Sequence, residues 1–309
     1  MLRPAGGHPP VPGCFPFLPV AWEETPSEIM AVTRTLNCPV CSAPSAVEHV
    51  DKDFSLCRCS ECDHCFTDLN SLNHLEVYEA PYFQEEHRNW FLHPNLSLYR
   101  KLRQVILGHN RRASVLDVGC GNGNFLRYLA SKGDDLSLTG IDIAPNQPSF
   151  NIKYLLGNFL CEKVDEKFDV LVSLSVIEHV PEVTAFATRL DELCQPGGLV
   201  IIQTIDERSV IYRASRILER AGWSVPLKRL YSKHHLNHFT DSSLKYLLKR
   251  QGLAIVQVFR HNSPMAAVDI PPTSPLGAVI LRAGIWVAFQ LGQLTRRTMY
   301  QTIVARKPD

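Results

Sequence analysis

The chain has 309 residues, of which 45% are hydrophobic and 20% are charged, and its formal net charge is +1. This length allows one large domain with a smaller one, and the near-neutral charge gives no global sign of binding to nucleic acid or to an anionic membrane. Six of the ten cysteines lie between Cys38 and Cys65. Such clustering indicates a metal site in a reducing, cytoplasmic compartment rather than a disulfide framework.

The N-terminal segment, residues 1–30, differs in composition from the rest of the chain. It carries seven prolines and shows no helical or strand periodicity. Proline removes backbone donors and interrupts helices, so we expect this segment to be disordered. Met30 is a candidate alternative start, because the first interpretable motif follows it.

Residues 31–70 contain two C-x-x-C pairs with 17 residues between them. This spacing predicts a small zinc ribbon in which four thiolates complete a closed tetrahedral site, and a closed site is structural rather than catalytic. Cys57, His64 and Cys65 lie close enough in sequence to leave other ligand choices open. The expected zinc ligands are Cys38, Cys41, Cys59 and Cys62.

The expected ribbon is acidic. Between residues 38 and 65 it holds two basic residues, Lys52 and Arg58, against five acidic ones. Proteins that bind nucleic acid neutralise phosphates with clustered Lys and Arg, so the ribbon does not favour a nucleic-acid partner.

Residues 71–110 form an expected helical linker. Its first half is rich in aromatic residues, and the apolar spacing over 94–107 predicts a helix. We expect the aromatic residues to pack between the two domains, and a lid over a substrate is the alternative.

From residue 111 to 309, apolar strand patterns alternate with helical patterns, which predicts an α/β fold. We expect a Rossmann-like, seven-stranded, mostly parallel sheet with helices on both faces, and insertions at 205–241 and 261–298. The expected strands cover 114–118, 137–142, 152–155, 168–173, 198–204, 254–260 and 299–305, and the expected helices cover 123–132, 183–195 and 242–250.

Polar and glycine-rich segments follow these strands, where parallel sheets bind ligands. The run 114–126 ends a strand at Asp117, places three alternating glycines in a turn and opens a helix. Backbone N–H groups at such a turn can approach a ligand closely. Asp142, about 20 residues further on, suits a ribose diol. Taken alone, the glycines also fit a nicotinamide site and Asp142 an exposed turn, but the glycine spacing differs from the dinucleotide form.

The ordered motifs V-L-D-V-G-C-G-N-G, G-I-D-I, F-D-V-L-V-S-L-S-V-I-E-H-V and P-G-G-L-V-I-I resemble those of class I S-adenosylmethionine-dependent methyltransferases. The resemblance covers roughly residues 110–260 and the final strand. It implies that S-adenosylmethionine is the cofactor. The positions it implies are Gly119, Cys120 and Gly121 around the methionine part, Asp117 at its amino group, Ser175 and Val176 on the methionine side, Asp142 at the ribose, Ile143 against the adenine, and Asn158 and Phe159 at the adenine edge.

Three histidines are candidates for the acceptor side. The V-I-E-H-V stretch resembles ubiquinone-pathway O-methyltransferases, and His179 is either a general base or a residue bordering the cofactor. The 205–241 insertion resembles segments that cover the acceptor in this family. Within it, His235 and His238 are candidates for acceptor contact or base, and with His234 they also allow a metal site. The basic residues of the insertion suit an acidic acceptor or a solvated face.

The second insertion contains an apolar segment, 276–294, with Arg282 near its middle. It is too short and too interrupted to predict a transmembrane helix. We expect a buried helix that covers a pocket, with peripheral membrane contact as the alternative.

Together these features predict an enzyme that transfers a methyl group from S-adenosylmethionine to a small-molecule or lipid-linked acceptor, at oxygen. Two alternatives stay open: an RNA or protein methyltransferase with the ribbon as reader, and a non-catalytic scaffold that binds the cofactor. The fourth strand lacks the [ND]-P-P-[YFW] motif of many base and amide N-methyltransferases. The sequence leaves the acceptor and the oligomeric state open.

Overall fold

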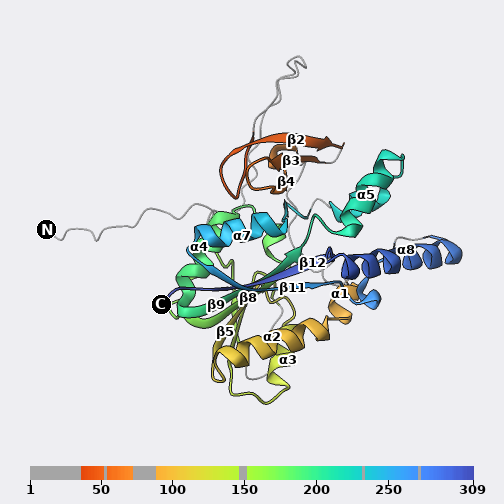
Figure 1. Ribbon diagram of the computed structural model, residues 1–309. Helices are drawn as coiled ribbons and strands as arrows, with labels where there is room; N and C mark the ends of the chain where they lie inside the picture. The colour runs from red at the N-terminus through yellow and green to blue at the C-terminus, as the bar shows by residue number, and fades with distance from the viewer. Residues whose placement is uncertain (1–35, 52–53, 72–87, 146–151, 232–233, 271–272) are drawn as a thin grey trace.

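The computed structural model describes residues 36–51, 54–71, 88–145, 152–231, 234–270 and 273–309 (Figure 1). The disorder expected for residues 1–30 lies outside these ranges, as does the aromatic first half of the expected linker.

A seven-stranded sheet forms the centre of the larger part of the molecule, as predicted. Five neighbouring strands are parallel, and the last strand is inserted antiparallel to both of its neighbours. The apolar runs of the central strands explain their position, because they are buried on both faces. In order across the sheet the strands are β11 (Ala254–His261), β12 (Tyr300–Arg306), β9 (Cys194–Ile205), β8 (Phe168–Leu174), β5 (Ser114–Val118), β6 (Ser137–Asp142) and β7 (Lys153–Leu156).

Helices cover both faces of this sheet (Figure 1). On one face lie α2 (Leu96–His109) and α3 (Asn124–Ala130), whose buried residues share a core with Val115 and Val170. On the other lie α4 (Val183–Leu193) and α7 (Asp241–Arg250), which pack against Leu171 and Ile303. The Rossmann-like architecture expected from the sequence is therefore confirmed.

The N-terminal ribbon is a small antiparallel sheet that takes its last strand from the 205–241 insertion. Four strands are consecutive, and the fifth pairs Asn237 with Phe66 and His238 with Cys65. The ribbon therefore shares a sheet with the larger part of the chain, which the sequence does not predict. Its strands are β1 (Leu36–Asn37), β2 (Pro44–Val50), β3 (Ser55–Cys59), β4 (Cys65–Thr67) and β10 (Asn237–His238), and the short 3-10 helix η1 (Leu69–Ser71) follows β4.

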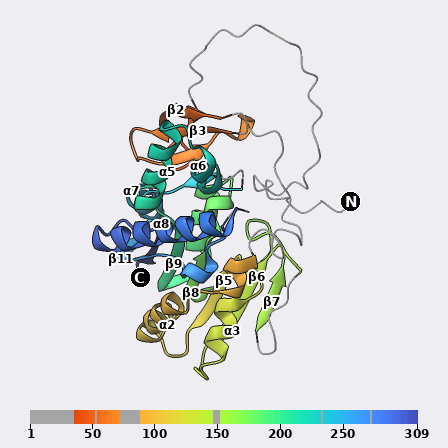
Figure 2. The same ribbon diagram turned by 90° about the vertical axis from the view of Figure 1, so that its right-hand side faces the viewer.

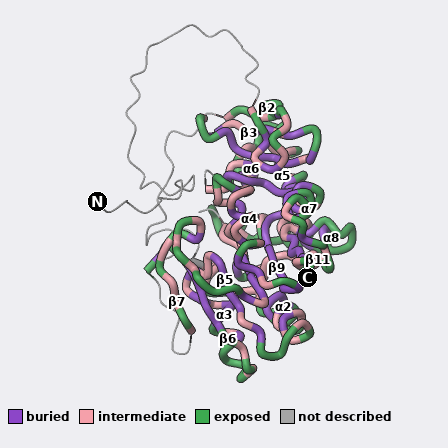
Figure 3. Tube along the Cα trace, turned by 90° about the vertical axis from the view of Figure 1, so that its left-hand side faces the viewer, coloured by how far each residue is buried: buried purple, intermediate pink, exposed green. Residues whose placement is uncertain are grey.

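The two insertions supply helices that extend from one side of the molecule (Figures 1 and 2). The first contains α5 (Val210–Arg220) and α6 (Val225–Leu230). The second, between β11 and β12, contains the 3-10 helix η4 (Met265–Ala267) and α8 (Pro275–Leu294). By length and composition, α8 is the one described helix that could cross a membrane. Figure 3 shows that burial is concentrated in the central strands, whereas much of α8 is exposed.

Candidate active site

The glycine turn after β5 adopts a backbone that side chains rarely allow. Gly119, Gly121 and Gly123 have φ values of 69°, 53° and 74°. A Cβ atom on Gly119 would also clash with the side chain of Val176. Only glycine combines positive φ with this close approach, so the turn requires glycine, and its Gly119 and Cys120 N–H groups donate to the Ile141 carbonyl of the next strand.

Asp142, the last residue of β6, holds this turn in place. Its carboxylate accepts hydrogen bonds from the Gly121 N–H at 2.7 Å and from the Ala144 N–H at 2.8 Å. Burial raises the pKa of Asp142, and the two backbone donors oppose that rise. The acid is thus fixed at the strand end beside the turn, and its contact with a ribose stays a prediction.

Asp117 is a second buried acid at the same edge of the sheet. Its side chain is 3% exposed, and among the described residues none donates a hydrogen bond to its carboxylate. Burial, reinforced by the charge of Asp142, raises the pKa of Asp117 well above its usual range. A buried carboxylate that no protein group donates to can accept hydrogen bonds from a cationic ammonium group, so Asp117 suits the amino group of S-adenosylmethionine.

The residues expected around the adenine differ in exposure. Ile143 is 53% exposed directly after Asp142, where an aromatic ring can cover it. The side-chain oxygen of Asn158 accepts a hydrogen bond from the Leu160 N–H at 3.0 Å, so it caps a turn. Phe159 is buried, and its ring packs against Phe186. Ile143 and Asn158 are therefore exposed, whereas Phe159 is not.

On the methionine side, the chain is bent sharply after β8. Ser175 has a φ of 56°, unusual for a residue other than glycine, and its hydroxyl donates to the Gln203 side-chain oxygen at 3.0 Å. Val176 then contacts Gly119, and half-buried Cys120 lies beside Gly140. The predicted methionine-side residues Ser175, Val176 and Cys120 thus lie around the glycine turn.

His179 and His235 come together just beyond this bend. Their ring centroids are 4.9 Å apart, and one ligand atom from each lies within 4.8 Å of a Glu178 oxygen. The His179 Nδ1 lies 2.7 Å from the carbonyl oxygen of His234. A carbonyl only accepts hydrogen bonds, so Nδ1 carries the proton and Nε2 of the neutral ring is the basic nitrogen.

Glu178 is a member of this group that the sequence did not single out as a partner of His235. It is 1% exposed, and it accepts a hydrogen bond from the Thr204 hydroxyl at 2.8 Å. Burial raises its pKa to about 7. In the sequence, its position beside His179 already marks Glu178 as a residue near the site. Its approach to His235 depends on how the distant insertion folds, so the sequence does not show it. A carboxyl group with this pKa can give or take a proton near neutral pH.

His238 lies apart from this pair. It is fully buried in β10, where its ring packs against Tyr231 at a centroid distance of 4.6 Å. Burial lowers the pKa of His238 well below its usual range, so the ring is neutral. Its ring centroid is 6.3 Å from that of His235. The predicted acceptor contact therefore belongs more naturally to His235 than to His238.

The four predicted zinc ligands meet at the tips of two ribbon turns. All four Sγ atoms lie within 4.8 Å of one another, with Cys38–Cys62 at 3.6 Å and Cys41–Cys59 at 3.3 Å. A tetrahedral zinc site with Zn–S bonds of about 2.3 Å requires Sγ separations of about 3.8 Å. The hydrogen bond with Cys62 lowers the pKa of Cys38 to about 6, which favours the thiolate. The four cysteines thus fit a structural zinc ion.

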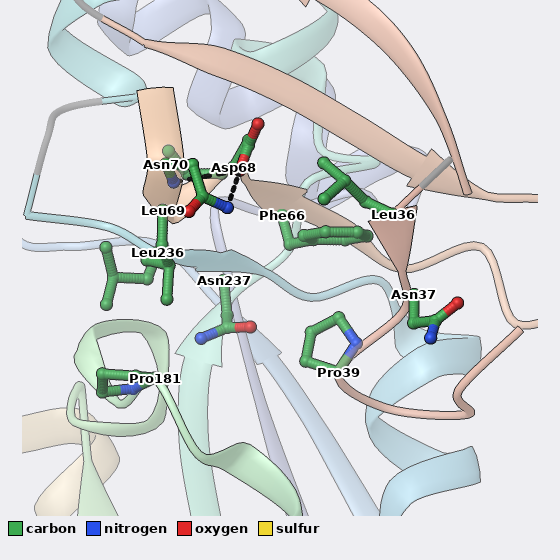
Figure 4. Close-up of a pocket in the computed structure, with 11 residues that line it drawn as sticks. Leu36, Asn37, Pro39, Phe66, Asp68, Leu69, Asn70, Pro181, Leu236 and Asn237 are labelled. Atoms are coloured by element: carbon green, nitrogen blue, oxygen red, sulfur yellow. Dashed lines mark hydrogen bonds between the residues drawn. The ribbon is translucent and has the colours of Figure 1, made fainter. Parts of the chain in front are cut away.

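A small cavity of about 180 Å³ lies between the ribbon and the larger part of the molecule (Figure 4). Figure 4 shows Phe66 and Pro39 on one side and Leu236 and Pro181 on another, with Asp68 bonded to Asn70. Pro181 follows His179 by two residues. The cavity is smaller than a typical pocket for a drug-sized ligand, so it suits only a small group.

The sequence of this chain was compared with protein families and with curated proteins. Residues 87–258 match the family described as a methyltransferase domain. A ubiquinone biosynthesis O-methyltransferase of Pseudomonas fluorescens (strain Pf0-1) is 33% identical over 110 residues, which are 32% of this chain and 47% of that protein. The Rickettsia typhi enzyme of the same name is 32% identical over 134 residues, 40% of this chain and 54% of that protein. The chain spans about half the length of the curated relatives it matches.

Solved structures show the same fold at low identity. One is a chain from the complex between the Haloferax volcanii Trm112 methyltransferase activator and a methyltransferase. It has a TM-score of 0.52 and 15% identity, over 76% of this chain and all of that one. Another is Haemonchus contortus phosphoethanolamine N-methyltransferase 2 in complex with S-adenosyl-L-methionine. It has a TM-score of 0.51 and 12% identity, over 77% of this chain and 61% of that one.

Proposed function

The chain belongs to the methyltransferase-domain family, and we propose that it transfers a methyl group from S-adenosylmethionine to a hydroxyl oxygen of a small-molecule or lipid-linked acceptor. The cofactor supplies a methyl group activated by a sulfonium charge. The residues of this chain bind it, align the acceptor and remove the acceptor's proton.

The observation that carries the proposal is the pair of buried acids at the ends of β5 and β6. Asp142 holds the glycine turn through the Gly121 N–H at 2.7 Å, and Asp117 is buried without a donor among the described residues. Two carboxyls beside the glycine turn can accept hydrogen bonds from a ligand with a diol and an ammonium group.

The choice of oxygen rests on the group formed by Glu178, His179 and His235. A hydroxyl acceptor must lose a proton as its oxygen bonds to the methyl carbon, and the Nε2 of His179 can take that proton. Glu178, with a pKa raised to about 7, can stabilise the imidazolium that results. The name of the Pseudomonas relative, an O-methyltransferase, points in the same direction.

The test combines binding with transfer, on the full zinc-loaded chain. Calorimetry with S-adenosylmethionine and S-adenosylhomocysteine measures cofactor affinity, and a labelled methyl donor with a panel of phenols, alcohols and amines measures transfer. We expect binding of both ligands, and transfer of the methyl group to hydroxyl acceptors.

His179→Gln should reduce transfer at least about 100-fold while leaving cofactor affinity within a few-fold. His109→Gln, on the far end of α2, is the control. Transfer to amines alone would contradict the oxygen assignment, and absent binding by folded protein would contradict the proposal as a whole.

A further inference from the structure

The outer face of α8 is a largely apolar surface that nothing in the described chain covers, with Gln290 as the polar residue within it. Seven of its large apolar side chains are between 46% and 82% exposed, and only Phe289 and Gly292 are buried. At about 100° per residue, the seven fall on an arc of about 140° that runs the length of the helix. This α8 surface consists of Leu276, Val279, Ile280, Trp286, Val287, Leu291 and Leu294.

The connections of α8 prevent it from crossing a bilayer alone. The helix lies between β11 and β12, which are neighbours in one sheet. Its C-terminal end is fixed to both strands through Asn262, which donates to the Phe289 carbonyl at 3.0 Å and accepts from the Met299 N–H at 2.8 Å. Because both flanking segments return to the same sheet, the helix can only lie against a membrane from one side.

The charges around the α8 surface are positive. The segment 275–297 contains Arg282, Arg296 and Arg297, all exposed, and no acidic residue. None of the three forms an ion pair with a carboxylate in the described part of the chain. Two copies of this surface would bring like charges together, whereas an anionic lipid surface would complement them.

The neighbouring helix α5 also exposes basic and apolar side chains on this side of the molecule. Val210, at its start, donates its N–H to the Arg297 carbonyl at 3.0 Å, and both helices extend from the same side of the molecule (Figures 1 and 2). The outer face of α5 exposes Arg213, Ile217 and Arg220. Trp223, 44% exposed, follows it. Tryptophan and arginine at the rim of an apolar face are typical of interfacial helices.

We propose that the α8 surface docks this protein on an anionic lipid bilayer, with α8 lying in the plane of the interface. Its apolar face enters the boundary between headgroups and acyl chains, and Arg282, Arg296 and Arg297 meet lipid phosphates. This docking is a property of the insertion and does not depend on the proposed reaction.

The position of α8 also connects the membrane to the cofactor edge. A cavity of about 500 Å³ lies under it, lined by Trp286 and Phe289 of α8 and by Met265 of η4. Beyond η4 lies α1 (Arg88–Leu92), whose Asn89 donates to Asp269 at 2.6 Å and whose Phe91 ring stands over Gly121. A docked bilayer would thus face a cavity two elements away from the glycine turn.

Vesicle flotation with the full chain tests the docking. Vesicles of pure phosphatidylcholine are compared with vesicles that contain about one-third phosphatidylglycerol, without any methyl donor. We expect binding to the anionic vesicles that weakens with salt, and quenching of tryptophan fluorescence by brominated lipids that Trp286→Phe reduces.

Ile280→Glu/Val287→Glu should weaken vesicle binding more than about tenfold, because two charges enter the apolar face. Leu156→Glu/Val256→Glu adds the same charge at two similarly exposed positions on the sheet edges and should leave binding unchanged. Replacing Arg282, Arg296 and Arg297 with glutamine should weaken binding to anionic vesicles about fivefold for each arginine.

Calorimetry with S-adenosylhomocysteine shows whether each variant is folded and keeps docking separate from the proposed reaction. Failure of the folded wild type to bind either vesicle would overturn the proposal. So would equal binding by Ile280→Glu/Val287→Glu. Self-association that this variant abolishes, without vesicle binding, would assign the surface to a second copy of the chain instead.

Discussion

Asp117 couples cofactor binding to a proton. Burial beside Asp142 raises its pKa well above the usual range, so ionisation of the carboxyl is disfavoured in the free protein. A cationic ligand favours the carboxylate, and the complex therefore holds fewer protons than the free protein. Affinity for S-adenosylmethionine should rise with pH until the pH is high enough for Asp117 to be ionised in the free protein.

The measurement is calorimetry at one neutral pH in two buffers that differ in ionisation enthalpy. We expect protons to be released on ligand binding, and this release to be lost in Asp117→Asn. That variant should also bind about 10- to 100-fold more weakly, since it loses a charge-assisted hydrogen bond. Identical apparent enthalpies in both buffers would show that Asp117 does not change its protonation.

His261 makes stability depend on pH in the acid range. Burial lowers its pKa to about 4, and its Nε2 lies 2.9 Å from the Thr302 hydroxyl. In the unfolded chain His261 takes up a proton near pH 6.5, whereas in the folded chain it stays neutral at that pH. Its contribution to the free energy of unfolding is therefore complete above pH 6.5 and is lost as the pH falls toward 4. Between pH 6.5 and 5 the loss amounts to about 2 kcal/mol.

His261→Gln removes this titration. The free energy of unfolding of the wild type, from urea titrations at several pH values, should fall more steeply than that of the variant. His93→Gln, in an exposed position, should keep the wild-type slope. Parallel pH profiles for wild type and His261→Gln would contradict the assignment.

The same residues show why some site features can be predicted from sequence. The glycine turn joins β5 to α3, and Asp142 ends the next strand, β6, so the spacing of these residues in the sequence reflects their geometry directly. The approach of Glu178 to His235, and the burial that raises the pKa of Glu178 to about 7, come from a segment more than 50 residues away. No local pattern records such a contact.

Glu207 ties the ribbon to the helices of the first insertion. It is 3% exposed, and its Oε1 accepts hydrogen bonds at 2.7 Å from Arg58 of β3, Arg216 of α5 and Tyr231. Arg58 and Arg216 also share Glu48. The acidity of the ribbon, which counted against nucleic acid in the sequence, is thus partly neutralised within the protein.

Removing the Glu207 charge should be costly. Glu207→Gln leaves two partly buried guanidinium groups without their central carboxylate, and we expect a loss of about 3 kcal/mol in the free energy of unfolding. Glu219→Gln, on the same helix as Arg216, should change it by less than about 0.5 kcal/mol. Chemical denaturation measures both. Equal stability of the two variants would mean that the Glu207 charge does not stabilise the contact between the ribbon and the insertion helices.

Secondary structure differed in how well the sequence predicted it. Strand β5 and strand β6 match their expected bounds, because apolar runs that end at polar or glycine residues locate buried parallel strands well. Strand β10 was not expected. It has two residues and forms only by pairing with β4, more than 160 positions away in the sequence. The local strand propensity of these residues therefore does not predict it.

The ribbon and the larger part of the chain form one connected structure. The Pro39 and Val40 carbonyls accept hydrogen bonds from Thr184 of α4 and Arg250 of α7, at 2.8 Å each. Buried ribbon residues such as Cys59 share a hydrophobic core with Phe239. Zinc at the ribbon should therefore stabilise the insertion strand that leads from His235, and not only the ribbon itself.

Two neighbouring cysteines of β3 allow a matched test of that coupling. Cys59→Ser removes a thiolate from the four-cysteine cluster, whereas Cys57→Ser changes a buried cysteine outside it. We expect Cys59→Ser to lose bound zinc, and amide exchange to show lost protection at Asn237 and His238 while β8 and β9 stay protected. Cys57→Ser should keep one zinc ion and the wild-type pattern. If Cys57→Ser loses the metal and Cys59→Ser retains it, Cys57 is the true ligand. If Cys59→Ser loses zinc but β10 stays protected, the ribbon does not support the histidine strand.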